Sequence, residues 1–467
     1  MSDKNLEEYH ITKTTTIAYG FANFADNSAT QMFNFLLFTF YYAVVGLNVN
    51  LITIGFIIFS IWNAINDPIM GSISDRSKSK WGRRKPYIIA GTIPWCILLV
   101  LLWTPPPGDP TVIFIYFLII VLLYDTFYTM FYVNQMSLFP EMYEDLEERA
   151  KANIILQVFT IFALIIGFVA PSFFIPQYED PAYFENYRYA GLFTAIVVAI
   201  SVSIFLKYGL KERKEYSKDS ELAPPFFKSL KYSLKSRAFI TYIIANFSTY
   251  YILGIFTAIT ALYGSFVLGI ENSLFLSLLL GASFISAALF MIVWQKLSLK
   301  LGVRKGLMVA LVSGIITSFP FMFITGLVWG VLYYFIAGFS LAGMLFFRRI
   351  TLAAVIDDDE LKTGVRREGA FYGVDALIVK LSTIFIFLSI SLVFNSVGWE
   401  VFDPKGTTEE TILGLRLLMW LFPTIGLTLG LISMYYFPIT KERYNILSEH
   451  SKKLHLEKKE KIVSPPK

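Results

Sequence analysis

The chain has 467 residues, of which 55% are hydrophobic and only 16% are charged. Soluble proteins carry about 25% charged residues, so this composition excludes an ordinary water-soluble protein and indicates a bilayer protein. The net charge of +5 is modest and the basic residues lie in short segments between apolar runs, which argues against a nucleic-acid partner.

The apolar runs predict twelve transmembrane helices, because about 20 apolar residues rising 1.5 Å each cross the hydrocarbon core. We therefore expect an all-α membrane protein in which the lipid bilayer is the main partner. In chain order the expected helices occupy residues 15–45, 49–73, 86–104, 111–139, 151–171, 187–206, 238–268, 273–296, 304–324, 328–348, 368–395 and 411–437.

The helices divide six and six around a long basic segment that contains Pro224 and Pro225. A connection of this length usually joins separate units. We predict an N-terminal six-helix bundle at 1–206, a cytoplasmic linker at 207–237, a C-terminal bundle at 238–437 and a cytoplasmic tail at 438–467. Short motifs at Gly82 and Gly302 are similar, as two pseudo-symmetric halves of a major facilitator fold would require.

Lysine and arginine set the orientation, because cytoplasmic loops of membrane proteins are basic. With the N-terminus inside, 36 of the 40 basic residues fall in inner segments, and only Arg188 and Lys405 fall in outer loops. We predict that both termini are cytoplasmic in a multi-pass protein of the plasma membrane.

The chain offers little for metal or redox chemistry. Its one cysteine is Cys96, inside an apolar run, and its three histidines lie in the polar tails. A disulfide, a metal site and a cofactor are therefore not expected. A membrane-embedded enzyme would need a histidine pair or an activated nucleophile, so we expect no enzyme.

The second helix carries the strongest candidate for a cation site. Asn63, Asn66 and Asp67 are spaced i, i+3 and i+4, so their oxygens share one helix face. A carboxylate in a membrane helix costs about 2.5–3.5 kcal/mol and needs a reason. Pro68 removes a backbone donor next to Asp67. Hard cations prefer such oxygen ligands, although Asp67 could instead pair with an arginine to hold a gate.

Several segments resemble the glycoside–pentoside–hexuronide:cation symporters, the melibiose permease-like branch of the major facilitator superfamily. The resemblance lies in residues 19–47, in the motif NAINDPIMGSISDRSKSKWGRRKP at 63–86, in residues 353–373 and in Lys380. It implies a monomer that carries a small-molecule solute by alternating access, coupled to Na⁺, H⁺ or Li⁺. It also adds Thr129 as a hydroxyl ligand beside Asn63, Asn66 and Asp67.

The chain departs from the family at its site. Asn63 stands where the family has an acidic residue, which leaves Na⁺, H⁺ and uncoupled transport open, although Asp125 could compensate. Changes at the sugar-binding positions leave a sugar, a lysolipid or other amphiphile, and an organic anion open. The expected solute-binding residues are Asp26, Asn27, Asp125, Tyr132, Gln157 and Lys380.

Charged residues at the inner helix ends are candidates for a gate that closes the cytoplasmic side. Weak ion pairs suit a gate, because each must break in every cycle; plain positive-inside charge explains part of the pattern. The expected gate residues are Asp75, Arg76, Gly82, Arg83, Arg84, Glu144, Arg149, Asp357, Arg366 and Arg367. A non-transporting receptor or a lipid scramblase of the same fold is a further alternative.

Overall fold

The computed structural model describes residues 11–75, 77, 79, 81–143, 146–212, 234–363, 368–447 and 450. In these residues the only regular secondary structure is helical. The chain forms two compact units. One comprises Met1–Ala223 with Asn272–Ser277, and the other comprises Pro224–Glu271 with Leu278–Lys467.

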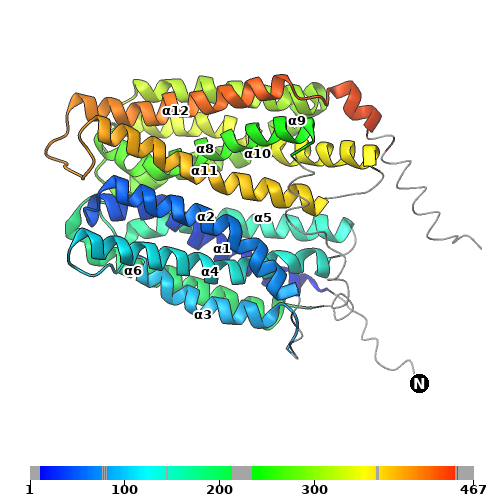
Figure 1. Cartoon of the computed structure of the whole chain (residues 1–467), viewed down its shortest axis with the longest axis horizontal. Coiled ribbons are helices and arrows are strands. Elements are labelled where there is room, and N and C mark those ends of the chain that lie inside the picture. The colour runs from blue at the N-terminus through cyan, green and yellow to red at the C-terminus, as the bar shows by residue number, and fades with distance from the viewer. Residues whose placement is uncertain are drawn as a thin grey trace, which may run out of the picture. The chain divides into compact units, whose positions relative to one another are not determined.

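The first unit contains α1 to α6, drawn in blue and cyan in Figure 1. Within it, α1 packs on α5 and α6, α3 packs on α4 and α6, and α2 packs on α4. Two π-helical turns, η1 and η4, extend α1 and α6. The bounds are α1 Lys13–Thr39, η1 Phe40–Val44, α2 Val49–Asp75, α3 Lys85–Leu101, α4 Pro110–Met142, α5 Leu146–Val169, η2 Ala170–Phe173, η3 Pro181–Tyr183, α6 Phe184–Ile204 and η4 Phe205–Gly209.

The second unit is built around α8, which packs against α10, α11 and α12. Its elements are α8 Arg237–Phe266, α9 Ser273–Ser318 except for its first residues, which belong to the first unit, η6 Phe319–Met322, α10 Leu327–Thr363, α11 Glu368–Ser396 and α12 Glu409–Tyr435. The helix α9 holds two of the expected spans, which meet at Gly302. That glycine has φ 70° and ψ 178°, a conformation that breaks the helix there.

Among the described residues, nine helices are long and apolar enough to cross a membrane. The count differs from twelve for three physical reasons. One candidate is the double helix α9. The helix α3, at Lys85–Leu101, is apolar but short. The helix α1 carries Asn23, Asp26 and Asn27, which lower its hydropathy. Counted in this way, the described helices match the twelve expected segments of an all-α major facilitator fold.

The end of the tenth helix differs most from the expectation. We placed the end of the tenth helix at residue 348, but α10 continues to Thr363. The extension is charged, and the pair Asp358 and Lys362, at i and i+4, forms a salt bridge along it. Hydropathy marks where a helix leaves the apolar layer, whereas such side-chain pairs continue the helix beyond it.

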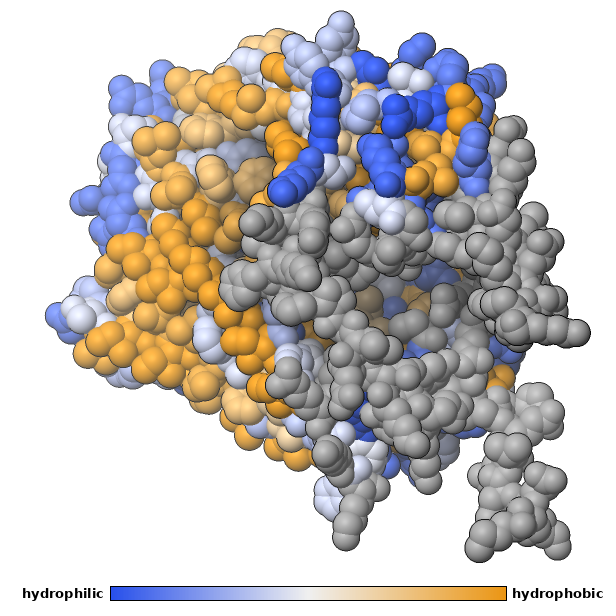
Figure 2. All heavy atoms as spheres, turned by 45° about the vertical axis from the view of Figure 1, so that its right-hand side comes forward, coloured by the Kyte–Doolittle hydropathy of each residue, from blue (hydrophilic) through white to orange (hydrophobic). Residues whose placement is uncertain are grey.

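The sides of the helices expose apolar residues, as a membrane protein requires. In the face drawn in Figure 2, hydrophobic residues form a broad area left of centre, and the most hydrophilic residues lie at the left edge and at the upper right. Along α2 six isoleucines keep 37% to 48% of their surface exposed: Ile54, Ile58, Ile61, Ile65, Ile69 and Ile73. They recur every three or four residues, so they form one stripe along the helix.

Candidate functional site

The polar face of α2 lies away from its isoleucine stripe, because Asn63 and Asp67 fall about half a turn from Ile65. Asn66 lies between the two faces and is buried. This face meets α4, the helix on which α2 packs. The helix continues through Pro68. The expected cation-binding residues of α2 are therefore turned into the first unit and away from the exposed side.

Asp125 on α4 is the centre of this polar contact. The Asn63 amide donates to its Oδ1, and the Asn66 amide donates to its Oδ2 at 3.0 Å. Asn66 also reaches the Asp125 main-chain carbonyl at 3.2 Å. Asp125 is 1% exposed and Asn66 is 2% exposed. The sequence offered Asp125 as a solute contact or as a compensation for Asn63, and the structure brings it together with Asn63 and Asn66.

One helical turn away, Thr129 donates its hydroxyl hydrogen to Asp67 Oδ1 at 3.1 Å. Thr129 is fully buried and Asp67 is half-buried. The four residues expected to bind the cation therefore lie in one interface with Asp125, which we call the α2–α4 cluster: Asn63, Asn66, Asp67, Asp125 and Thr129. Its carboxylate, amide and hydroxyl oxygens are of the kind that hard cations bind.

Asp26 forms a second polar group on α1. The Tyr128 hydroxyl donates to Asp26 Oδ1 at 2.7 Å, and Thr30 and Asn27 reach the carboxylate at 3.4 Å and 3.5 Å. Asp26 and Asn27 are both half-buried. The structure thus joins two of the expected solute-binding residues to a tyrosine that sequence reasoning missed.

Three tyrosines form a column along α4 next to Asp26. Tyr128 stacks on Tyr132 with ring centroids 5.4 Å apart and on Tyr124 at 6.1 Å. Phe33 stacks on the far side of Tyr124 at 4.9 Å. The i, i+4 spacing of these tyrosines would have revealed the column. Tyr132, an expected solute-binding residue, therefore lies at one end of this column. The middle ring is Tyr128, whose hydroxyl donates to Asp26.

The other two expected solute-binding residues are on α5 and α11. Gln157 is on an exposed face of α5, where its amide contacts Asn153 at 3.5 Å, its only hydrogen bond in the described part of the chain. The large apolar residues Ile154 and Val158 share this face. Lys380 is half-buried on α11 of the second unit.

Arg83 and Arg84, two of the expected gate residues in the loop between α2 and α3, form ion pairs within the first unit. Both guanidinium groups contact Glu141 at the end of α4, at 2.5 Å and 3.0 Å. Arg84 also donates to Ser74 of α2 at 3.3 Å. The loop therefore connects the ends of three helices in the first unit.

Glu212 is a partner of this loop that sequence reasoning missed. Its carboxylate accepts hydrogen bonds from the backbone N–H groups of Arg83, Arg84 and Lys85, at 2.6, 3.0 and 2.6 Å. These are N–H groups at the start of α3, which have no partner inside the helix. Gly82 has φ 107°, and a Cβ there would lie 2.7 Å from the same carboxylate. The sequence gives no local signal, because about 130 residues separate the partners.

The remaining gate residues are placed only in part. Arg76, Glu144, Arg366 and Arg367 lie outside the described residues, and the side chains of Asp75 and Arg149 are likewise not described. Asp357 is half-buried on α10. Its neighbour Asp358, 2% exposed, pairs with Arg443 at 2.7 Å.

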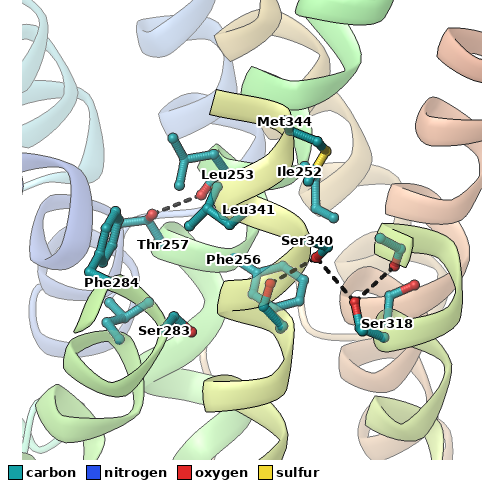
Figure 3. A pocket seen from close by; sticks show the side chains of 14 residues that line it. Ile252, Leu253, Phe256, Thr257, Ser283, Phe284, Ser318, Ser340, Leu341 and Met344 are labelled. Atoms are coloured by element: carbon teal, nitrogen blue, oxygen red, sulfur yellow. Dashed lines mark hydrogen bonds between the residues drawn. The ribbon is translucent and has the colours of Figure 1, made fainter. Parts of the chain in front are cut away.

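A small cavity of about 40 Å³ lies inside the second unit between α8, α9 and α10 (Figure 3). Its wall is apolar, and the hydroxyls in it bond to the protein itself. Thr257 donates to the Leu253 carbonyl at 2.8 Å, and Ser340 contacts Thr317 at 3.1 Å. The volume suits a few water molecules, and no expected site residue lines it.

Curated relatives are transporters. The isoprimeverose transporter of Lactiplantibacillus pentosus is 22% identical over 450 residues, 93% of this chain and 91% of that one. The sodium-dependent lysophosphatidylcholine symporter 1 of Mus musculus is 23% identical over 421 residues, 82% of this chain and 77% of that one. An uncharacterized symporter of Synechocystis sp. is 27% identical over 247 residues, which span 52% of this chain and only 44% of that protein.

Solved structures show the same fold. The nucleoside transporter NupG matches with a TM-score of 0.67 at 13% identity, covering 91% of this chain and 99% of that one.

A family model described as MFS/sugar transport protein matches residues 18–441. The protein is therefore a membrane transporter and not an enzyme, and it acts on a small solute across a lipid bilayer. The chain belongs to the MFS/sugar transport protein family of the major facilitator superfamily.

Proposed function

We propose that the protein is a symporter that couples the uptake of a sugar-like solute to Na⁺ or H⁺ by alternating access. The observation that carries the proposal is the α2–α4 cluster, in which two carboxylates, Asp67 and Asp125, share one buried interface with amide and hydroxyl groups. Intramembrane carboxylates are costly, so two in one interface favour a role in cation binding.

Asp125 belongs to the cation site in this proposal. The chain has Asn63 where the family has an acidic residue, and Asp125 lies against that amide. Two carboxylates neutralise a monovalent cation better than one, which supports Na⁺ as the coupling ion. With no cation bound, the amide N–H groups of Asn63 and Asn66 stabilise the Asp125 charge.

The solute would bind beside Asp26 and Asn27, with Tyr132, Gln157 and Lys380 as further contacts. Asp26 is held by Tyr128 in the tyrosine column of α4. Carboxylates form strong charge-assisted hydrogen bonds to hydroxyl groups, and tyrosines combine an apolar ring face with a polar end. A carboxylate next to stacked tyrosines suits a sugar, and the isoprimeverose transporter is a full-length relative.

Transport also needs a gate and an orientation. We propose that the loop held by Arg83, Arg84 and Glu141, together with Asp357, forms part of a cytoplasmic gate. We further propose a monomer in the plasma membrane with both termini in the cytoplasm, as the basic inner segments favour.

A lysolipid is the second candidate solute. It is favoured by the similarity to the mouse lysophosphatidylcholine symporter over 82% of this chain. The two solutes differ in their polar groups: a sugar offers neutral hydroxyls, whereas a lysophospholipid offers a phosphate and a long apolar chain.

A thermal-stability screen of the purified protein separates the two. A ligand that binds the folded state raises the apparent melting temperature by mass action. We expect isoprimeverose to stabilise the protein more in NaCl than in choline chloride, and lysophosphatidylcholine to have no Na⁺-dependent effect. Na⁺-dependent stabilisation by lysophosphatidylcholine alone would select the second candidate. Equal behaviour of both compounds in both salts would contradict cation-coupled symport of either.

A further inference from the structure

The second unit contains a buried carboxylate that the proposed transport sites do not use. Asp375 lies about one turn into the apolar part of α11 and is 4% exposed. The amide of Asn246 on α8 donates to its Oδ1 at 2.6 Å. Asn246 is itself 2% exposed. An ionisable residue in this position is by default a functional one.

The polar groups around Asp375 have unused hydrogen-bonding capacity. The Oδ1 of Asn246 is buried and has no hydrogen-bond partner in the described part of the chain. The buried Tyr242 hydroxyl interacts with the Asp375 carboxylate. Buried polar atoms usually find partners, so an orphan amide oxygen beside a carboxylate needs an explanation.

Among the described residues, no ion pair holds the carboxylate. Arg348 on α10 acts on Asp375 through space. Its guanidinium lies 5.1 Å from the ring centroid of Tyr250 and forms no salt bridge with Asp375. In the part of the chain that the structure describes, the charged and titratable groups that act on the site are Tyr242 on α8, Arg348 on α10 and, through Tyr242, Tyr372 on α11 itself.

One added proton would use this capacity. When Asp375 is ionised, it accepts the Asn246 N–H, as the structure shows. When it is protonated, its O–H becomes a donor, and Asn246 Oδ1 accepts that hydrogen once the amide turns over. The Tyr242 hydroxyl can donate to the carboxylate in one state and accept from the carboxyl group in the other. A bound metal cation would instead place a second positive charge near Arg348.

We propose that Asp375, with Asn246 and Tyr242, is a reversible proton-binding site in the second unit, separate from the α2–α4 cluster. Asp375 binds the proton, and Asn246 and Tyr242 exchange hydrogen-bond roles with it. The site adds a protonation step to the transporter whichever cation the α2–α4 cluster takes.

Infrared spectroscopy of the full chain in lipid nanodiscs tests this without a solute or Na⁺, so its outcome is independent of the proposed symport. We expect wild type to show a carbonyl stretch of a buried protonated carboxyl group that disappears as pH rises. Asp375→Asn should lack the band. Asp403→Asn, which removes an exposed loop carboxylate, should keep it.

Asn246→Ala should shift the frequency of the band and its titration midpoint, because the partner amide is gone. This variant keeps the test open if Asp375→Asn does not fold. A wild-type spectrum with no titrating buried carboxyl band, or a band unchanged in both Asp375→Asn and Asn246→Ala, would overturn the proposal.

Discussion

Thr129 on α4 donates a hydrogen bond to Asp67 on α2 across 3.1 Å, inside a single unit of the protein. One turn away, the amides of Asn63 and Asn66 on α2 donate hydrogen bonds to the Asp125 carboxylate on α4. Each helix therefore contributes one carboxylate and the donors for the other helix's carboxylate. This reciprocal arrangement fixes the positions of both carboxylates.

Asn63→Asp tests whether the α2–α4 cluster binds a cation. The substitution places a second carboxylate against Asp125, and two adjacent carboxylates cannot both ionise cheaply without a cation between them. We expect the melting temperature to fall in choline chloride and to recover in NaCl by mass action. Asn63→Ala is the control, because it removes the same hydrogen bond without adding charge. Equal melting of both variants in the two salts would argue against a cation site.

Glu212→Ala tests the contact at the start of α3. The Glu212 carboxylate accepts three consecutive backbone N–H groups, and loss of a single cap costs about 0.5–2 kcal/mol. We expect faster hydrogen exchange at the amides of Arg83, Arg84 and Lys85. Glu148→Ala, at an exposed position on α5, is the control. Unchanged exchange at these three amides would show that Glu212 does not protect them.

Gly302→Ala tests the break inside α9. Gly302 has φ 70°, and a Cβ there would lie 2.8 Å from the Lys441 Cβ. A residue with a Cβ in this left-handed region costs roughly 1–2 kcal/mol, so thermal stability should fall. Gly281→Ala is matched in the same helix and meets no atom within 4 Å; we expect it to be neutral or to stabilise by up to about 1 kcal/mol. A larger loss of thermal stability in Gly281→Ala than in Gly302→Ala would contradict a helix break at Gly302.

Asp109 gives a prediction about pH, because it lies outside the apolar spans. Its carboxylate accepts the Thr111 backbone N–H at 2.7 Å, which holds the pKa of Asp109 below its ordinary value of 3.8. Because the folded-state pKa is lowered, the cap stabilises α4 fully at pH values above the ordinary pKa of 3.8. This stabilisation is lost as the pH falls through the folded-state pKa.

The matched variant is Asp109→Asn, which caps a helix without titrating. We expect the difference in melting temperature between wild type and this variant to be constant above about pH 4 and to change below it. A difference that stays constant throughout acid titration would show that the cap does not depend on the charge.

The sequence predicted the helices well, because a span of apolar residues must close its own backbone hydrogen bonds in lipid. It also predicted that Asn63, Asn66 and Asp67 share a face, since helical periodicity alone decides that. The end of α10 at Thr363 was missed, because side-chain pairs beyond the apolar run extend that helix.

What the sequence could not predict are contacts between distant segments. The sequence offered Asp125 both as a solute contact and as a compensation for Asn63. The Asn63 amide and the Asp125 carboxylate are 62 positions apart, so only the packing of α2 on α4 shows that they are in contact. Glu212 lay inside the predicted linker, where an acidic residue carries no pattern that points to the start of α3. Tyr128 was missed for a different reason: tyrosine is common in membrane helices, and its bond to Asp26 depends on how α1 meets α4.

Solute accumulation in proteoliposomes that contain Asp67→Asn tests the central claim most directly, with the solute that stabilises the purified protein. If Asp67 binds the coupling cation, the variant should fold and still exchange solute across the membrane, but it should no longer concentrate solute when a Na⁺ or H⁺ gradient is applied. Concentrative uptake at the wild-type rate by Asp67→Asn would contradict the account.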